Sequence, residues 1–419
     1  MSNNNKTPAI RFKGFTDTWE QRKLSDTLNF LSNNTLSRAE LSEDTGTYKN
    51  VHYGDVLIKF GEYIDAQSTD LPYIADDEKA KKFESSKLQD GDIIIADTAE
   101  DEAVGKCVEI GNIGDLSIVS GLHTIPCRPK VKFAPAYLGF YLNSSSYHDQ
   151  LIPLMQGIKV TSISKSAISD TLISAPTDLS EQGKIGQFFS QLDTLTTLHQ
   201  RKCDKLIQFK AAMLQKMFPQ NGANKPEIRF RGFTDAWEQR KLGDIVTVYD
   251  GVHQTPNYQT SGVMFLSVEN IATLKSNKFI SIEDFKRDYK VYPQRNDILM
   301  TRIGDVGTTN VVTDNDVKAY YVSLALLKYK ETNPFFLSSA IQSDFVQKGL
   351  SNRTLKTAIP MKINKDEIGQ VDVMLPTSAD EQDKIGSFFS QLDTIITLHQ
   401  CKCDKYKSIK AGLIRKLFP

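Results

Sequence analysis

Two long segments of the chain have apolar residues at the spacing of a helix with one buried face. In 178–219 and again in 378–419, such positions recur every seven residues in two series that are offset by three. In the first segment the series are Ile185, Leu192, His199, Leu206, Met213 and Phe188, Leu195, Lys202, Phe209, Lys216. Polar residues suited to cap a helix open both segments, namely Asp178 or Ser180 and Ser378 or Asp380. We therefore predict two helices of about 40 residues, each ~55–60 Å long.

Helices of this length with one apolar face need a partner. Either each helix docks on its own domain or the two pair antiparallel as a coiled-coil-like unit with the intervening domains at opposite ends, and we favour the pair. The histidines on the seam suit either a pH switch or a metal site, or a polar contact that fixes the register, and we favour the register. The residues expected to hold the pair or dock a partner are Phe188, Phe189, Leu192, His199, Phe388, Phe389, Leu392 and His399.

Shorter patterns between the long segments alternate between strand and helix. Runs with a strand core follow turn residues in each half, and prolines open two apolar segments as helix starts. The expected strands are Asp92–Ala96, Asp297–Thr301, Thr171–Ser174 and Gln370–Leu375, and the expected helices begin at Pro135 and Pro334. The fold class predicted is mixed α/β (α+β), with two globular domains separated by the long helices.

The chain also repeats itself. Pro8–Asp26 and Pro226–Asp244 are identical at 15 of 19 positions, and Glu181–Pro219 and Glu381–Pro419 at 25 of 39. The segments between these copies differ from each other. A duplicated frame with unlike inserts predicts an internal pseudo-twofold scaffold that presents two different surfaces.

Charge is distributed unevenly along this frame. The overall net charge is zero, but 26–175 carries 13 basic and 22 acidic residues, whereas 176–243 carries 11 and 7. A lone nonspecific DNA-binding protein is strongly basic, so DNA contact here would need local patches or partners. The chain has no apolar run long enough to span a bilayer and no signal-like start, and we expect a cytoplasmic location.

Motifs for catalysis are missing from the sequence. There is no phosphate-binding GxxxxGK[ST] loop and no glycine-rich cofactor loop after a strand. Asn333-Pro334-Phe335-Phe336 is faintly similar to the Asn-Pro-Pro-Phe/Tyr loop of amino-methyltransferases. It lacks the second proline of that loop, and we favour a helix start as its explanation. Cys401 and Cys403 lack a second ligand pair at metal spacing. We expect no catalytic residue, no metal and no cofactor bound by this chain.

Several polar and basic loops suit DNA. Glutamine and asparagine can bond adenine with two hydrogen bonds, while threonine, tyrosine and lysine can reach phosphates. Each stretch alone is equally compatible with a solvated loop, but their recurrence in both halves favours DNA. The candidates are Lys159, Thr161 and Lys165 in the first half, and His253, Gln254, Thr255, Asn257, Tyr258, Arg302, Thr308, Arg353, Lys356 and Lys362 in the second.

Together these features resemble the specificity subunit of type I restriction–modification systems. Asn33–Ile64 and Gly251–Ile271 are similar to openings of target-recognition domains, and the segments EQGKIGQFFSQLD and EQDKIGSFFSQLD resemble the starts of the family's conserved helices. The resemblance implies a division into a first recognition domain (1–177, with arm 8–26), a spacer helix (178–219), a second recognition domain (220–377, with arm 226–244) and a distal helix (378–419).

The resemblance also implies a mechanism. Each domain reads one half of a bipartite double-stranded DNA target, and the helices set the gap. Two methyltransferase subunits methylate adenine N6 with S-adenosylmethionine, and two motor-nuclease subunits use ATP and Mg²⁺. The alternatives are a single-chain DNA methyltransferase or nuclease, which would act alone, and a protein-interaction scaffold that does not read DNA.

Overall fold

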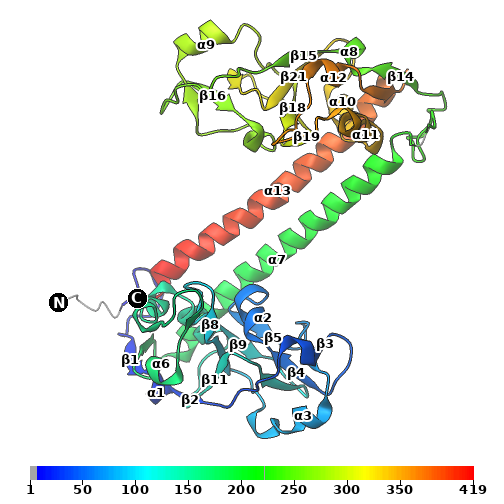
Figure 1. The fold of residues 1–419 in the computed structure, drawn as a ribbon. Helices are drawn as coiled ribbons and strands as arrows, with labels where there is room; N and C mark the ends of the chain where they lie inside the picture. The colour runs from blue at the N-terminus through cyan, green and yellow to red at the C-terminus, as the bar shows by residue number, and fades with distance from the viewer. Residues whose placement is uncertain (1–6, 221) are drawn as a thin grey trace. The chain divides into compact units, whose positions relative to one another are not determined.

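The protein is described here from a computed structural model that covers residues 7–220 and 222–419. The chain forms two compact units, one made of residues up to Gln200 together with Cys401–Pro419, and the other of Arg201–Gln400. Each long helix, α7 (Leu179–Lys216) and α13 (Ala379–Leu417), begins in one unit and ends in the other (Figure 1). The boundaries of the units therefore fall within the helices.

Unit 1 is a mixed α/β domain built on a central sheet. In its described part, five strands run in the order β2 (Leu28–Phe30), β11 (Thr124–Pro129), β7 (Ile93–Ala96), β9 (Cys107–Gly111) and β5 (Tyr63–Asp65). Neighbours are antiparallel except β5 and β9, which are parallel. The predicted strand Asp92–Ala96 is confirmed as β7, whose four side chains are all buried.

Smaller sheets surround the central one. A second sheet has the order β10 (Ser117–Ser120), β4 (Tyr48–Val51), β6 (Tyr73–Ile74) and β3 (Leu41–Ser42), and β12 (Thr161–Ser162) pairs with β8 (Thr98–Ala99). The N-terminal arm adds β1 (Glu20–Lys23), which pairs antiparallel with β13 (Leu172–Ala175). The short helices are α1 (Leu24–Thr27), α2 (Tyr53–Ile58), α3 (Asp77–Lys81), α4 (Tyr137–Leu142), α5 (Ser145–His148) and α6 (Lys165–Ile168).

Unit 2 follows the same plan with different lengths. Its larger sheet runs β15 (Val246–Asp250), β21 (Leu324–Tyr329), β18 (Ile298–Ile303) and β19 (Asp305–Val311), and its smaller sheet β17 (Phe279–Ile280), β16 (Val263–Leu266) and β20 (Lys318–Tyr320). The arm strand β14 (Glu238–Lys241) pairs with β22 (Asp372–Leu375), as β1 does with β13. The helices are α8 (Leu242–Ile245), α9 (Ile282–Asp288), α10 (Pro334–Ile341), α11 (Asp344–Arg353) and α12 (Lys365–Gly369).

The main core of each unit includes residues from the ends of both long helices. In unit 1, Ile185 and Phe189 of α7 pack with Leu417 and Phe418. In unit 2, Ile385 and Phe389 of α13 pack with Met217 and Phe218. Because the start of one helix meets the end of the other in each core, the helices pair antiparallel within each unit, as predicted.

The buried seam of this helix pair differs from the predicted one. The series that contains Phe188 was expected to be buried, but Leu195 is 38% and Phe209 46% exposed. Instead the series one residue further on faces the partner helix, with Phe189, Cys203 and Met217 buried. The second contact series therefore follows the first by four residues rather than three, a spacing that also keeps side chains on one helical face.

The two predicted proline helix starts have different outcomes. Pro334 is the first residue of α10, and the Asn333 side chain accepts hydrogen bonds from the backbone N–H groups of Phe335 and Phe336. The helix expected at Pro135 begins only at Tyr137, after Ala136 with a left-handed φ of 67°. There is no capping side chain beside Pro135, and the Glu109 carboxylate of β9 instead accepts hydrogen bonds from the N–H groups of Ala136 and Gly139.

Candidate nucleic-acid interface

An arginine–glutamate pair attaches each N-terminal arm to a long helix. Arg11 donates two hydrogen bonds to Glu181 at the start of α7, at 2.6 and 2.7 Å, and Arg229 donates two to Glu381 at the start of α13, at 2.6 and 2.8 Å. Both glutamates are only 1% exposed. The hydrogen bonds that Arg11 donates to Glu181 raise the pKa of Arg11, and those that Arg229 donates to Glu381 raise the pKa of Arg229. The same clamp is thus built twice.

These pairs were not predicted from the sequence. The signal was available, since all four residues occupy identical positions in the repeated segments. An arginine and a glutamate that are both retained in otherwise diverging copies are candidates for a buried pair. Their separation of about 150 to 170 residues hides the contact from any local pattern.

Each arm also closes the far end of the other helix. The N–H of Ile10 donates to the carbonyl of Lys416 in α13, and the N–H of Ile228 donates to that of Lys216 in α7. These bonds satisfy carbonyls that the last helical turn leaves unpaired. The Lys184 ammonium lies 4.6 Å from the Phe15 ring centre, and that of Lys384 lies 4.8 Å from the Phe233 ring centre. We call each arm with its two helix ends the frame.

The candidate docking residues occupy matching places in the two frames. Phe189 and Phe389 are fully buried and stack near Phe418 and Phe218, with ring centres 5.9 and 5.8 Å apart. Phe188 and Phe388 are half-buried at the edge, beside the arm residues Phe12 and Phe230. Leu192 and Leu392 are buried as well. These side chains hold arm and helix together. The exposed residues on the outer surface of the frame are therefore the candidates for contact with a partner.

The two seam histidines lie inside the helix pair. The His199 ring stacks on Tyr406 with 5.7 Å between ring centres, and His399 is 8% exposed. Across the same pair, Lys410 bonds both Asp193 and Glu62 in unit 1, while Lys210 bonds Asp393 in unit 2. Polar contacts between specified residues on the two helices favour one register.

The polar loop predicted to read DNA is exposed in unit 2. His253, Gln254, Thr255, Asn257 and Tyr258 are all exposed. The loop lines a hollow of about 520 Å³ that is closed on its other side by α9, where Arg287 is paired with Asp284 and Asp288. The Tyr258 ring packs edge-on against Phe265, and the Lys278 ammonium lies 5.6 Å from its centre. The amide and hydroxyl groups of this loop are therefore accessible to solvent, and the Tyr258 ring at its end is held by packing.

Arg302 is more buried than expected for a side chain that contacts DNA bases. Its side chain is 7% exposed, donates to the Ile363 carbonyl at 3.0 Å, and is ion-paired with Asp250. Thr308, on the adjoining strand β19, is exposed. The guanidinium therefore ties the end of β18 to the segment that precedes α12, which favours a positioning role over direct contact with DNA.

The loop that follows α11 is anchored at that same place. The backbone groups of Leu355 and Lys362 bond each other, and the N–H of Ile363 donates to the carbonyl of Arg302. Lys356 and Lys362 are exposed on this loop. Arg353 differs from them, because its guanidinium bonds Glu367 at 2.8 Å.

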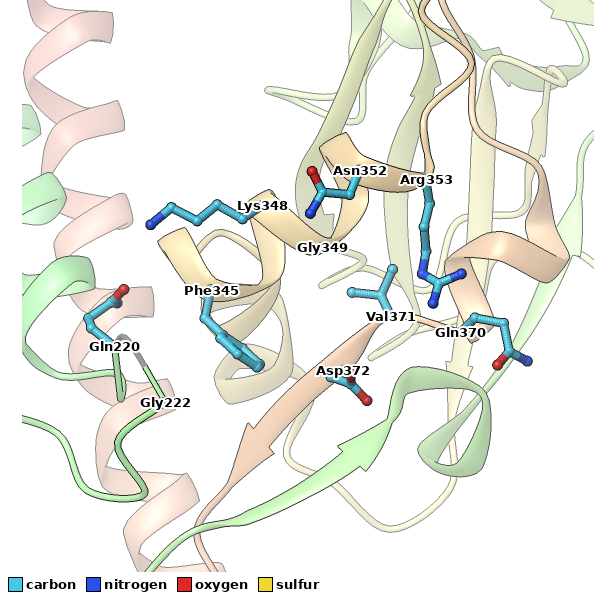
Figure 2. Close-up of a pocket in the computed structure, with 10 residues that line it drawn as sticks. All are labelled: Gln220, Gly222, Phe345, Lys348, Gly349, Asn352, Arg353, Gln370, Val371 and Asp372. Carbon is cyan, nitrogen blue, oxygen red and sulfur yellow. The ribbon is translucent and has the colours of Figure 1, made fainter.

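Arg353 lines a hollow of about 600 Å³ between α11, the β22 strand and the linker after α7 (Figure 2). Figure 2 shows its side chain directed toward Val371 and Gln370, while Lys348 of the same helix extends on the other side, toward Gln220. This hollow holds two basic groups and one carboxylate, Asp372, rather than a set of converging catalytic groups.

Unit 1 has a loop of the same construction. Gln156 and Ser162 bond each other through their backbones, and Ile163 donates to the carbonyl of Asp97 as Ile363 does to that of Arg302. Lys159 is exposed and Thr161 half-buried, while Lys165 donates to the Leu31 carbonyl at 2.8 Å. The structure thus brings the three candidates of the first half to one loop and its supporting helix.

The position that Arg302 holds in unit 2 belongs to Asp97 in unit 1. The Asp97 carboxylate lies 3.3 Å from the His123 ring, which also contacts Tyr53 edge-on at 5.2 Å between ring centres. Thr98 donates to Asp97 at 2.8 Å. This partly exposed polar cluster was not predicted from the sequence, because its members come from three separate segments with no common motif.

Among residues 7–220 and 222–419, no group of three or more His, Cys, Asp or Glu side chains is arranged to hold a metal ion. Within the same residues, no helix is both long enough and apolar enough to cross a membrane. What the described loops offer is hydrogen-bond donors, acceptors and lysines on anchored backbones. Such groups are suited to binding a partner through hydrogen bonds and ion pairs.

Comparison with known proteins identifies the class. A family model described as "Type I restriction modification DNA specificity domain" matches residues 16–208 and 234–405, which is most of the chain. The chain belongs to this family. It is the DNA specificity subunit of a type I restriction–modification system, the noncatalytic component of such a complex.

Of two similar solved structures, the first shares its fold at low sequence identity. The S subunit of the type I restriction–modification system from M. genitalium is 13% identical, with a TM-score of 0.64 and coverage of 99% of both chains. The HsdS subunit from Thermoanaerobacter tengcongensis is 17% identical with 96% of both chains covered and a TM-score of 0.40. A search of curated proteins found no match.

Proposed function

We propose that each unit reads one half of a bipartite DNA target and that the repeated frames dock two copies of one partner. The observation that carries this proposal is the contrast within the chain. The two frames repeat the same arginine–glutamate clamp, the same lysine over phenylalanine and the same backbone bond to a helix end. The loops of the two units, by comparison, carry different side chains on the same backbone anchors. Identical surfaces suit identical partners, and unlike loops suit unlike half-sites.

Each unit would divide the work between base edges and phosphates. In unit 2, the exposed loop His253, Gln254, Thr255, Asn257 and Tyr258 is the candidate for base reading, because amides there are free to pair with base edges. The exposed residues Thr308, Lys356 and Lys362 are candidates for phosphate contact. In unit 1 the corresponding candidates are Lys159 and Thr161. Lys165, Arg302 and Arg353 are proposed to position these loops, since each is engaged within its own unit.

The partners follow from the family rather than from a site in this chain. We propose that two methyltransferase subunits dock on the frames and transfer methyl groups from S-adenosylmethionine to adenine N6, one in each half-site. Two motor-nuclease subunits that use ATP and Mg²⁺ would complete the complex, in the cytoplasm. On this proposal, 1–177 and 220–377 act as the recognition domains, and 178–219 and 378–419 as the spacer helices.

Long-read mapping of methylated adenines tests the reading function. Cells that carry this chain with the methyltransferase of its system should show one bipartite motif. Replacement of residues 27–175 by the corresponding segment of another specificity subunit should change one half of the motif and leave the other. A single undivided motif, or a motif unaffected by the exchange, would contradict the proposal.

The spacing function has a separate test. Insertion of one heptad into both helices at matched positions of the pair, so that the antiparallel contacts keep their phase, should lengthen the unread gap of the motif. An insertion of seven residues adds about 10 Å of helix, or roughly three base pairs. A gap of unchanged length would show that the helices do not set it.

A further inference from the structure

The anchored loops 156–162 and 355–362 share a feature that the proposed reading function does not use. Each is closed at its base by backbone hydrogen bonds, Gln156 with Ser162 and Leu355 with Lys362. Directly after each loop, a buried isoleucine, Ile163 or Ile363, fixes the chain to the sheet through a further backbone bond. The loops therefore stand at the same place in the two units on equivalent supports.

Both loops present a fully exposed isoleucine. Ile158 is 102% exposed and Ile359 is 100% exposed, which makes them the two most exposed large apolar side chains among the described residues. Val160 accompanies the first at 55%, and Leu355 and Met361 accompany the second at 46% and 43%. A single exposed apolar residue is ordinary on a protein surface. The same exposure at the matched place of two units with different sequences indicates a shared use.

The charges beside these side chains point to the partner. Lys159 is exposed next to Ile158, and Lys356 and Lys362 are exposed on the loop of Ile359. An apolar tip flanked by ammonium groups is complementary to a base stack bordered by phosphates. Proteins that kink DNA use isoleucine, leucine, methionine and proline as wedges in this way. The second loop contains all four of these residue types, in Leu355, Ile359, Pro360 and Met361.

We propose that Ile158 and Ile359 are apolar wedges that enter the minor groove and open a base step in their half-sites, while the neighbouring lysines contact phosphates. This inference rests on the proposed reading of a bipartite target. It adds a mode of recognition, since the ease of opening a base step depends on its sequence even without hydrogen bonds to the bases. Glu100, Asp101 and Glu102 follow the strand beside the first loop, so the second loop is expected to contribute more.

The shape of the first loop is set by Gly157. Its φ of 120° is one that residues with a side chain rarely adopt, and a Cβ there would lie 2.0 Å from the carbonyl oxygen of Val160. Gly157→Ala therefore alters the presentation of Ile158 without changing the side chain of the wedge. It provides a second variant that is independent of apolar chemistry.

The test uses the chain assembled with its methyltransferase subunits and duplexes that carry the mapped motif, with 2-aminopurine placed at successive steps that do not flank the methylated adenines, because methyltransferases flip their target base out of the stack. For the wild-type complex, we expect fluorescence to rise at one step in each half-site on binding. Ile359→Ser should abolish the rise in the second half-site only and weaken binding about tenfold, ~1.4 kcal/mol. Ile158→Ser and Gly157→Ala should do the same in the first half-site with a smaller loss.

Matched controls separate the wedge from general exposure and from docking. Ile58→Ser and Ile282→Ser replace isoleucines that are 88% and 57% exposed elsewhere in units 1 and 2, and we expect both to bind as wild type. Ile359→Leu should retain the fluorescence rise. The mass of the assembled complex is measured for each variant. Loss of assembly in Ile158→Ser or Ile359→Ser would overturn the proposal in favour of a contact with protein.

Two further outcomes would also overturn it. One is wild-type affinity and fluorescence in both Ile158→Ser and Ile359→Ser. The other is a loss that is reproduced in the wild type by replacing thymines with uracils, because this would place the isoleucines on thymine methyl groups in the major groove. Failure of the reading function itself looks different, since the wild-type complex would then not prefer the motif duplex over a scrambled one.

Discussion

The two units of this chain bond the free N–H groups at the start of one short helix, α4 in unit 1 and α10 in unit 2, in different ways. In unit 2, Asn333 caps α10 from the residue before the helix. In unit 1, Ala134 stands in the corresponding place, and Glu109 reaches from the neighbouring strand to bond the N–H groups of Ala136 and Gly139. Glu109 is 3% exposed, and burial raises its pKa to about 7. One unit thus depends on a local neutral cap and the other on a buried ionisable group.

The units differ again where their loops are anchored, and agree where they meet the helices. The anchor position holds Asp97 beside His123 in unit 1 and Arg302 paired with Asp250 in unit 2. Yet both arms are held by a pair of nearly identical geometry between a half-buried arginine and a buried glutamate. Divergence is therefore greatest in the inserts, while the frame contacts that join arm and helix are retained.

The largest effect is expected when a frame clamp is broken. Arg11→Ala leaves the buried Glu181 carboxylate without its partner, which should destabilise unit 1 by about 3–5 kcal/mol. Arg229→Ala should do the same to unit 2 through Glu381. Hydrogen exchange resolved along the chain measures the two units separately. Arg22→Ala breaks an exposed pair with Glu20 and should change little. Unequal effects of the two clamp variants would show that the frames are not equivalent.

The second-largest effect is expected in the pH dependence of stability, which should differ between the two units. Because the pKa of Glu109 is raised from 4.5 to about 7 in the folded chain, the folded state holds the proton more tightly than the unfolded state. The resulting stabilisation of unit 1, at most about 3 kcal/mol, is present below pH 4.5 and is lost as pH rises through about 7.

The measurement for this prediction is the protection factor of α4, corrected for the intrinsic rate of exchange at each pH. Protection should fall across that range in the wild type and fall less in Glu109→Gln, whose side chain does not ionise. The α10 helix of unit 2 is the internal reference, because Asn333 does not titrate. A parallel fall in both helices would assign the effect to something other than Glu109.

The third-largest effect is expected on DNA recognition and should be confined to one half-site. Arg302→Ala removes the hydrogen bond to Ile363 and the pair with Asp250 that hold the loop 355–362 in place. In methylation assays, discrimination between the correct and a changed second half-site should fall by about 1–3 kcal/mol, the scale of one base contact. The first half-site should be unchanged. Arg295→Ala, which removes an exposed arginine of the same unit outside the hollow closed by α9, is the control. Equal loss at both half-sites would indicate general destabilisation instead.

The smallest effect tests the two caps. Asn333→Ala should destabilise unit 2 by about 1 kcal/mol, the usual value for an N-cap. Asn364→Ala is the matched control, since Asn364 precedes α12 but its side chain makes no capping bond. Ala134→Asn in unit 1 should give no gain, because Glu109 already bonds the helix start. Thermal unfolding of the variants, followed by hydrogen exchange in each unit, measures these differences.

Much of the architecture could be predicted because it is written in local periodicity and in repetition. Seven-residue spacing predicted both long helices, and the strand cores Asp92–Ala96 and Asp297–Thr301 are confirmed within β7 and β18. The antiparallel pairing within each unit is confirmed as well. The second contact series was wrong by one residue, because 185 with 188 and 185 with 189 both satisfy a helical face. Only the partner helix selects between them.

The candidate recognition surface was predicted less completely. Local composition found the exposed loop from His253 to Tyr258 and the lysines near 159 and 356. It placed Arg302 among DNA contacts, although that side chain is 7% exposed. An arginine next to glycines has the same appearance in sequence whether it faces solvent or a half-buried aspartate 52 residues away. The cluster of Asp97 and His123 left no local signal at all.

By itself, the sequence determined that two unlike inserts stand on a repeated frame with two long helices, because repetition and helical spacing are properties of the chain alone. Only the tertiary structure decided which residues clamp the frame, which helical face is buried and which loop residues remain in solvent. Those outcomes depend on contacts between residues about 30 to 170 positions apart, as in Arg11 with Glu181 and Glu109 with Gly139. Burial and pairing at such distances arise from packing, which no local pattern encodes.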